Sequence, residues 1–242
     1  MPAAVTDDEI AAANELLANA PPQEVLRWAV KRFHPRLLMA TAFGAEGCCL
    51  IDMLAKIEPG VAFINLDTGY QFPETLAVRE RVREKYGIAV ELVRPEVPVG
   101  EYERRNGRPV HQTDPNRCCH DRKIVPLKAA LARHAPLAWV SAIRKDQTAD
   151  RGVAGVVQWD RKFGLVKVNP LLNWTKKEVW GYVVRNEVPY NELHDRGYPS
   201  VGCWPCTRAV GEGEDERAGR WAGTAKKECG LHVVEEKDGS GI

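Results

Sequence analysis

Short apolar runs alternate with longer stretches of helical composition over the first 142 residues of the chain. The apolar runs are bounded by glycine, proline or charged residues, as buried strands of a parallel sheet usually are; they cover residues 36–41, 61–66, 88–93 and 137–142. We expect helices between them, at residues 46–57, 73–86 and 118–133. This alternation predicts an α/β fold: an open, mainly parallel twisted sheet with helices on both faces. Ligands of such a sheet bind beyond the carboxyl ends of its strands.

Two capping-box patterns mark the starts of further helices, because a Thr hydroxyl and a Glu three residues later satisfy free backbone N–H groups. Thr6 to Glu9 precedes an alanine-rich stretch, which predicts a first helix over residues 6–18. A second helix is expected after the two prolines at 21 and 22. The other capping box, Thr175 to Glu178, predicts a helix that begins there.

The C-terminal part of the chain has a different composition. From Pro189 onward it is rich in glycine, proline, tryptophan and charge, and it shows little periodicity. We therefore predict a single α/β domain over residues 1–210 and a mobile C-terminal tail over residues 211–242, whose last residues have the composition of a disordered segment.

Two strand-to-helix turns are suited to hold a nucleotide. The first apolar run leads into "TAFGAEG" and the second into "LDTGYQFPE". Glycine lets the backbone approach a ligand closely, and the start of a helix presents free N–H groups to an anion. Many strand-to-helix turns contain glycine, so neither turn identifies the ligand by itself.

The charge balance argues against a nucleic-acid or membrane partner. The 242 residues include 34 basic and 33 acidic side chains, for a net charge of +1, so any anion site must be local. No uncharged apolar stretch approaches the roughly 18 residues that a membrane span needs. The N-terminal "MPAAVTDDEI" carries acids where a secretory signal carries Lys or Arg. We expect a cytoplasmic protein; the sequence leaves open whether it is a homo-oligomer.

Seven cysteines in such a chain indicate metal binding or thiol chemistry, because reducing compartments keep thiols from forming disulfides. Cys118 and Cys119 form one close pair, and Cys203 and Cys206 form another far along the chain. Four thiolates bind zinc or an iron–sulfur cluster. Adjacent side chains on a helix point about 100° apart, which suits the corners of a 4Fe-4S cluster better than one ion. Alternatively, the first pair is simply buried and the second is a redox pair.

The other three cysteines differ from these four in their surroundings. Cys48 and Cys49 lie in an apolar helix behind the "FGAEG" turn, and we predict that they pack in the core. Cys229 has Lys226, Lys227 and His232 nearby in the tail. Positive neighbours lower the pKa of a thiol, and the thiolate is the nucleophile. A mobile segment could carry such a thiolate to a substrate and present the adduct to a second partner.

The ordered set of motifs extends over most of the chain. It comprises "FGAEG", "LDTG", "RCCHDRK", "RKDQ", "NPLLNWT", "PYNELHDRGYPSVGCWPCTRAV", "ERAGRW" and "KECGLH". Together these motifs resemble the assimilatory sulfonucleotide reductases, and within them the iron–sulfur type that acts on adenylyl sulfate. The resemblance implies a fold like that of the adenine nucleotide α-hydrolases, one 4Fe-4S cluster per chain, and reduction of adenylyl sulfate to sulfite and AMP. The electron donor would be reduced thioredoxin or a glutaredoxin-like protein.

The resemblance also implies roles for individual residues. The cluster ligands would be Cys118, Cys119, Cys203 and Cys206. Cys229 would attack the sulfur of the substrate, and Lys123 would lie between cluster and substrate, where the cluster tunes the electrostatics of the sulfate site. The two turns would hold the nucleotide through Thr41, Phe43, Gly44, Asp67, Thr68 and Gly69. Cations suit the charged oxygens of a phosphosulfate; those expected around it are Arg144, Lys145, Arg217 and Arg220.

The chain departs from the family pattern at two places. Thr41 stands where the family usually has Ser, which keeps the hydroxyl. Ala142 to Asp146 replaces a Gly-Leu/Ile-Arg-Arg-Asp sequence, so Lys145 supplies a point charge in place of a guanidinium fork. Neither change removes a catalytic group.

Three other functions compete with this interpretation. A reductase of 3′-phosphoadenylyl sulfate generally lacks the two cysteine pairs, although some cluster-bearing members accept both nucleotides. An ATP-using tRNA thiolation enzyme of the same fold would have an SGGxDS-type loop and a basic surface. A zinc-stapled binding module would be colourless and would give Cys229 no role.

Overall fold

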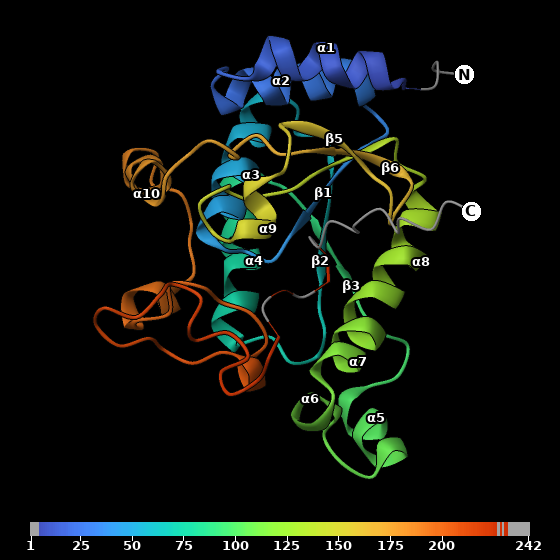
Figure 1. Ribbon diagram of the computed structural model, residues 1–242, viewed down its shortest axis with the longest axis vertical. Coiled ribbons are helices and arrows are strands. Elements are labelled where there is room, and N and C mark those ends of the chain that lie inside the picture. The colour runs from blue at the N-terminus through green and yellow to red at the C-terminus, as the bar shows by residue number, and fades with distance from the viewer. Residues whose placement is uncertain (1–4, 227, 229, 232–242) are drawn as a thin grey trace, which may run out of the picture.

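Six strands form one sheet in the computed structural model, which describes residues 5–226, 228, 230 and 231. They are β1 (Leu37–Thr41), β2 (Ala62–Leu66), β3 (Val90–Val93), β4 (Ala138–Val140), β5 (Val157–Asp160) and β6 (Leu165–Val168). Their spatial order is β3-β2-β1-β4-β6-β5, and every neighbouring pair is parallel except β5 and β6. The predicted open, mainly parallel sheet is therefore confirmed (Figure 1).

The helices follow the predicted alternation with the strands. In the part of the chain that the structure describes they are α1 (Asp7–Leu17), α2 (Pro22–Phe33), α3 (Ala45–Ile57), α4 (Pro73–Tyr86), α5 (Val99–Asn106), α6 (Val110–Thr113), α7 (Pro115–Cys119), α8 (Val125–His134), α9 (Ala149–Gly152) and α10 (Lys176–Arg185). Thr6 accepts a hydrogen bond from the N–H of Glu9 at the start of α1. At the start of α10, Thr175 and Glu178 form both bonds of a capping box. None of the helices among these residues is long and apolar enough to span a membrane.

Alternation along the strands gives the sheet an apolar core on each face, because successive side chains of a strand point to opposite sides. On one face, Leu37 and Met39 of β1 belong to the cluster that includes buried residues of α1, α2, α3 and α10. On the other face, Leu38 of β1 and Ile64 of β2 pack with buried residues of α8. Figure 1 shows α3 and α4 on one side of the strands and α8 on the other.

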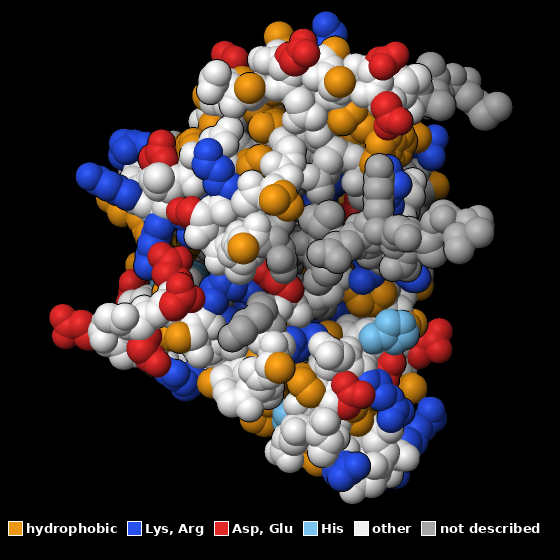
Figure 2. Space-filling view, in the orientation of Figure 1, with side chains coloured by type: hydrophobic (Ala, Val, Ile, Leu, Met, Phe, Trp, Pro, Cys, Tyr) orange, Lys and Arg blue, Asp and Glu red, His pale blue; other side chains and the backbone are white. Residues whose placement is uncertain are grey.

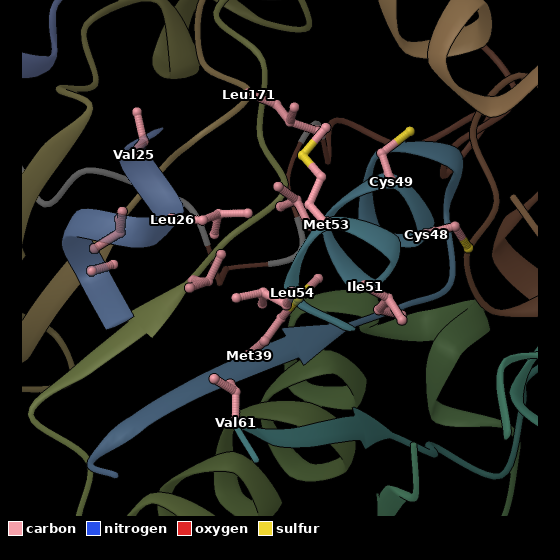
Figure 3. Packing of buried hydrophobic residues seen from close by; sticks show 14 of the residues in the cluster. Val25, Leu26, Met39, Cys48, Cys49, Ile51, Met53, Leu54, Val61 and Leu171 are labelled. Carbon is pink, nitrogen blue, oxygen red and sulfur yellow. The ribbon is translucent and has the colours of Figure 1, made fainter. Parts of the chain in front are cut away.

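Helix α3 lies at the centre of the larger core (Figure 3). Nine of its residues are buried, among them Met53, Leu54 and both cysteines. Cys48 and Cys49 are 1% and 0% exposed, and the Cys49 thiol lies 3.7 Å from the carbonyl oxygen of Val179. The prediction that these two cysteines pack in the core is confirmed.

The structure differs from the predicted elements at two places. The hairpin of β5 and β6 was not predicted. Lys167 interrupts the short apolar run of β6, although its side chain is buried like those of the other three residues of the strand. The single helix predicted over 118–133 is instead α7, a π-helical segment (His120–Ile124) and α8. Periodicity cannot detect one extra residue in a turn, and π-helical turns are frequent at functional sites.

Leu54 tests whether α3 anchors the core. Leu54→Ala removes methyl groups from a side chain that is 0% exposed, and it should lower the free energy of unfolding by about 2–5 kcal/mol. Leu16→Ala is the matched control, because Leu16 is 71% exposed on α1; it should change that free energy by less than about 0.5 kcal/mol. Urea denaturation measures both, and equal losses would contradict the assignment of the core.

Candidate functional site

A cavity of about 220 Å³ opens beyond the carboxyl ends of β1, β2 and β4. Thr41 and Asn65 line it from the ends of β1 and β2, where they are register partners, and Ser141 lines it from the end of β4. The chain runs from β1 outward through β2 to β3 and then returns to place β4 on the other side of β1. This reversal is the topological switch point where open α/β sheets bind ligands. We call this space the large cavity.

The "FGAEG" turn contributes its backbone and Thr41 to the large cavity. Thr41 and Gly44 line the cavity, whereas the Phe43 side chain is 0% exposed and belongs to the core. Phe43 has a φ of 55°, and its N–H donates to the Thr41 hydroxyl at 3.0 Å. A Cβ on Gly47 would lie 2.8 Å from that hydroxyl oxygen, so glycine is needed to leave the Thr41 side chain in place.

Some residues of the "LDTG" turn stabilise the turn itself, and one of them lines the large cavity. The Asp67 carboxylate accepts a hydrogen bond from the N–H of Gly69 at 3.0 Å and from Nε of Arg94 at 2.8 Å. Neither Asp67 nor Gly69 is among the described residues that line the large cavity. Thr68 does line it, and its hydroxyl oxygen lies 3.2 Å from Sγ of Cys203. Thr68 therefore connects the turn to the second cysteine pair.

All four cysteines of the two pairs line one small cavity next to the large cavity. Thr68, Lys123, Cys203, Arg220 and Trp221 line both. The pKa of the Cys118 thiol is raised to about 12, mainly by burial and also by the other three cysteines, against the opposing effect of Arg122. The pKa of Cys206 is raised to about 11 by burial, Cys203 and Cys119, against the opposing effect of Lys123 and Arg220. The two pairs, distant in sequence, therefore form one electrostatically coupled group. We call this space the cysteine cavity.

Backbone contacts hold the second pair against the β2–α4 turn. Cys203 forms an isolated antiparallel bridge with Gln71, and the N–H of Trp204 donates to the carbonyl of Tyr70 at 2.8 Å. The "ERAGRW" segment is attached to this pair in turn, because the N–H of Trp221 donates to the carbonyl of Cys206 at 3.0 Å. Trp221 is 4% exposed. The division into residues 1–210 and a tail remains a prediction, but residues near 221 are packed on the cysteine cavity.

The helix changes from α-helical to π-helical directly after the first cysteine pair. Cys118 and Cys119 end α7, and the π-helical segment that follows carries Arg122 and Lys123. Arg122 is 3% exposed, and its guanidinium donates to the carbonyls of Thr68 at 2.6 Å and Val97 at 3.1 Å. It also lies over the rings of Tyr70 and Tyr102, at 5.4 and 5.1 Å from their centroids. Arg122 therefore ties the first cysteine pair to the turn that holds the second.

Two of the four predicted substrate cations line the large cavity. Arg217 and Arg220 both do so. The Arg220 guanidinium lies 4.5 Å from the centroid of the Trp221 ring and donates to the hydroxyl of Ser200 at 3.2 Å. Arg217 forms an ion pair with Glu228 at 3.3 Å.

The other two predicted cations have different partners and do not line the large cavity. Arg144 is 2% exposed and pairs with Glu46 at 2.9 Å, Asp146 at 2.6 Å and Glu216 at 3.4 Å. Nζ of Lys145 donates to the side-chain oxygen of Asn173 at 3.0 Å. A motif gives the charge of a residue, but it does not give the carboxylates that the fold brings to it. Cys229, the predicted nucleophile, lies outside the described residues.

Several polar residues that line the large cavity were not predicted from the sequence, among them Asn65, Arg151 and His194. Asn65 is 1% exposed, and its side-chain oxygen has no hydrogen-bond partner among the described residues. Nδ1 of His194 lies 2.8 Å from the carbonyl oxygen of Tyr198, and burial lowers the pKa of the ring. The position of Asn65 near the end of an apolar run was a signal in the sequence. No neighbouring residue indicated a role for Arg151.

Comparison with known proteins identifies the family. Residues 36–209 match the sequence profile of the phosphoadenosine phosphosulfate reductase domain. The chain belongs to this reductase family. It is 46% identical over 215 residues to a phosphoadenosine 5′-phosphosulfate reductase of Gloeobacter violaceus, which covers 88% of each chain. It is 45% identical over 209 residues to adenosine 5′-phosphosulfate reductase 1 of Bacillus subtilis, covering 86% of this chain and 89% of that one.

Solved structures agree with the family and the fold. A phosphoadenylyl-sulfate reductase from Candida auris, solved as a phosphate complex, superposes with a TM-score of 0.77 at 32% identity and covers 87% of this chain and 100% of its own. A Candida glabrata FMN adenylyltransferase has a TM-score of 0.60 at 15% identity, over 85% of this chain and 68% of its own. The latter likeness is one of fold alone. This reductase-family chain therefore has the fold of adenine nucleotide-binding enzymes, as predicted.

Arg122→Gln tests whether this guanidinium holds the site of the reductase-family protein together. The substitution leaves the carbonyls of Thr68 and Val97 without their donors, and it should cost about 2–4 kcal/mol of unfolding free energy. Arg104→Gln is the matched control, because Arg104 is exposed on α5 and its guanidinium donates to the carbonyl of Gly100 one turn away; it should cost less than about 0.5 kcal/mol. Denaturant titrations compare the two, and a small loss for Arg122→Gln would contradict its role.

Proposed function

We propose that the protein reduces adenylyl sulfate to sulfite and AMP in sulfate assimilation, with reduced thioredoxin or a glutaredoxin-like protein as the electron donor. Its family membership makes it an oxidoreductase that acts on a sulfur group. The observation that carries the choice of substrate is the junction of the two cavities. The four-cysteine site and a nucleotide-sized space at the switch point share Thr68, Lys123 and Arg220 as walls. A cavity of this kind suits a nucleotide whose reacting sulfur lies close to a thiol-bound centre.

The donor set of the cysteine cavity fits a 4Fe-4S cluster. Its four thiols line one small cavity, and burial together with the neighbouring cysteines raises the pKa of Cys118 and of Cys206. A cationic group bound in place of the thiol protons would offset the negative charge of the thiolates. Within the described residues, no group of three or more His, Cys, Asp and Glu side chains lies in an arrangement that could hold a metal ion. Sulfurs that line a cavity match the separate iron atoms of a cluster. The ligands would be Cys118, Cys119, Cys203 and Cys206, and the bound cluster would supply a fixed charge beside the sulfate site.

The walls of the large cavity match the parts of adenylyl sulfate. Arg217, Arg220 and Lys123 supply positive charge for the phosphosulfate. The backbone after Thr41 leads into the N-terminus of α3, which favours an anion through its free N–H groups.

Asn65 and His194 offer side-chain acceptors that lack partners among the described residues, and the exocyclic amine of adenine is a donor of the matching kind. Asp67 and Arg144 would support the site indirectly through their ion pairs.

The reaction is a transfer of sulfur to a thiolate. The Cys229 thiolate attacks the sulfate sulfur, a sulfur–sulfur bond forms, and the sulfur–oxygen bond to the phosphate breaks, so that AMP leaves with the electron pair. Lys123, Arg217 and Arg220 would stabilise the charge that develops on the departing phosphate. A thiolate of reduced thioredoxin then attacks Cys229, and sulfite leaves with the electron pair of the sulfur–sulfur bond. The second thioredoxin thiol resolves the mixed disulfide, which restores the Cys229 thiol and leaves thioredoxin oxidised.

Two rival functions make different predictions. Reduction of 3′-phosphoadenylyl sulfate, or of both nucleotides, is compatible with the name of the Gloeobacter relative. A tRNA thiolation enzyme would need a basic surface, whereas acidic and basic side chains are interspersed on the face in Figure 2. The near-zero net charge and the cysteine cavity favour the reductase. Residence in the cytoplasm fits the thioredoxin donor, and a homo-oligomer remains compatible with the sequence.

Turnover with each nucleotide tests the proposed function. With reduced thioredoxin, we expect sulfite from adenylyl sulfate at a kcat/KM that exceeds that for 3′-phosphoadenylyl sulfate. Without thioredoxin, intact-protein and peptide mass spectrometry should find a sulfonate adduct on Cys229. An adduct on another cysteine would show that the nucleophile is wrongly assigned. Absence of turnover with either nucleotide would refute the proposed function.

Iron content tests the proposed ligands. Cys203→Ala should lose most of the iron and sulfide and the visible absorption of the anaerobically purified protein, because the site would keep only three thiolates. Cys48→Ala is the control, since Cys48 is a buried thiol of the core outside both cavities. It should keep its iron. Zinc in place of iron in the unmodified protein, or equal iron in the two variants, would contradict the cluster.

A further inference from the structure

The described residues on both sides of position 229 are attached to the body of the protein. Glu228 and Leu231 line the large cavity. The carbonyl of Gly230 accepts a hydrogen bond from Nζ of Lys162 at 2.8 Å. Leu231 packs against the apolar cluster that includes Leu38 and Trp139. Three different kinds of contact therefore hold this short segment at the cavity.

A further contact of this segment is a buried ion pair between Glu228 and Arg151. Nη2 of Arg151 donates a hydrogen bond to Oε2 of Glu228 at 3.1 Å. Nε of Arg151 lies 3.0 Å from Oε1 of Glu228, an ion-pair contact in which neither atom has a hydrogen-bond partner among the described residues. The Arg151 and Glu228 side chains are 8% and 3% exposed. A carboxylate this deeply buried requires a cation, because an unpaired buried charge is strongly unfavourable. Among the described residues, Arg151 and Arg217 are the cations that form ion pairs with Glu228.

The second cation joins this ion pair to the proposed substrate site. Nη2 of Arg217 lies 3.3 Å from Oε1 of Glu228, and Arg217 also lines the large cavity. A substrate anion that contacts Arg217 would therefore lie next to the tail. The same guanidinium serves the cavity wall and the attachment of the tail.

We propose that Glu228 is a positioning residue whose ion pair with Arg151 docks the tail and so presents Cys229 to a substrate in the large cavity. Consecutive Cα atoms are about 3.8 Å apart, so docking the residues before and after position 229 limits where the nucleophile can reach. Arg151 binds the tail through this ion pair, whereas the other cations of the cavity would contact the substrate. This assignment rests on the proposed function for the identity of the substrate, but the docking itself does not require a reaction.

An opposite role for Glu228 makes a distinct prediction. If its carboxylate only filled an anion subsite that substrate must empty, removing the charge would strengthen nucleotide binding. Docking of the tail instead predicts that Glu228→Gln slows the reaction of Cys229 with adenylyl sulfate, whatever the freed Arg217 does to the dissociation constant of AMP. Tighter binding of AMP together with an unchanged or faster reaction of Cys229 would overturn the proposal.

The reactivity of Cys229 tests docking without any substrate. In the full-length, cluster-containing protein, iodoacetamide labelling of the Cys229 peptide is followed by mass spectrometry for Glu228→Gln, Arg151→Gln and the double variant. Loss of the ion pair should speed labelling at least about tenfold, the factor that corresponds to about 1.4 kcal/mol. The double variant should be no faster than either single variant, because all three remove the same interaction.

Arg151→Gln separates docking from a through-space charge effect. Removing a nearby positive charge would raise the pKa of a thiol and slow its labelling, whereas release of the tail speeds it. Slower labelling in Arg151→Gln, or additive effects in the double variant, would overturn the proposal. Glu212→Gln, an exposed glutamate elsewhere in the C-terminal region, is the control and should label at the unmodified rate.

The reaction itself supplies the last readout. After addition of adenylyl sulfate without thioredoxin, Glu228→Gln should form the Cys229 sulfonate at least about tenfold more slowly than the unmodified protein, with AMP binding retained. An unchanged rate of adduct formation would overturn the positioning role. If the unmodified protein forms no adduct but the labelling rates behave as described, the proposed function fails while the docking ion pair stands.

Discussion

The attachment of the second cysteine pair to the β2–α4 turn is the contact on which the site depends. The hydrogen bond from the N–H of Trp204 to the carbonyl of Tyr70 and the bridge between Gln71 and Cys203 bring residues more than 130 positions apart side by side. The same turn is held from the other side by the buried guanidinium of Arg122, next to the first pair. Neither pair alone has enough thiolates for a cluster. Both come together in one site because Arg122, three residues after Cys119, and Trp204, next to Cys203, donate hydrogen bonds to carbonyls of the same turn.

Much of the fold and the burial of two of the cysteines could be predicted from the sequence because the signals were local. Parallel strands are short apolar runs, and their alternation with helices determines where a ligand cavity lies. The cysteines could be divided by their neighbours: Cys48 and Cys49 stand in an apolar helix and are buried, as their surroundings indicated. Two pairs of cysteines in one chain also suggested a shared site before their proximity was known.

The rest depended on contacts that a single segment does not contain. Arg144 and Arg217 have the same side chain and similar motif evidence, yet Arg144 is enclosed by three carboxylates while Arg217 lines the large cavity. Arg151 had no local mark because its partner, Glu228, lies 77 residues away. The π-helical turn after Cys119 also escaped detection, since one extra residue shifts side chains without changing composition.

The central claim is that a metal cluster and a nucleotide share the wall formed by Thr68, Lys123 and Arg220. Diffraction at the iron absorption edge from crystals grown with AMP tests it most directly. The account predicts anomalous difference density for iron at one place, between Cys118, Cys119, Cys203 and Cys206. The AMP phosphate should lie in the large cavity, on the other side of the wall formed by Thr68, Lys123 and Arg220. Iron at any other place, or AMP bound away from the carboxyl ends of β1 and β4, would contradict it.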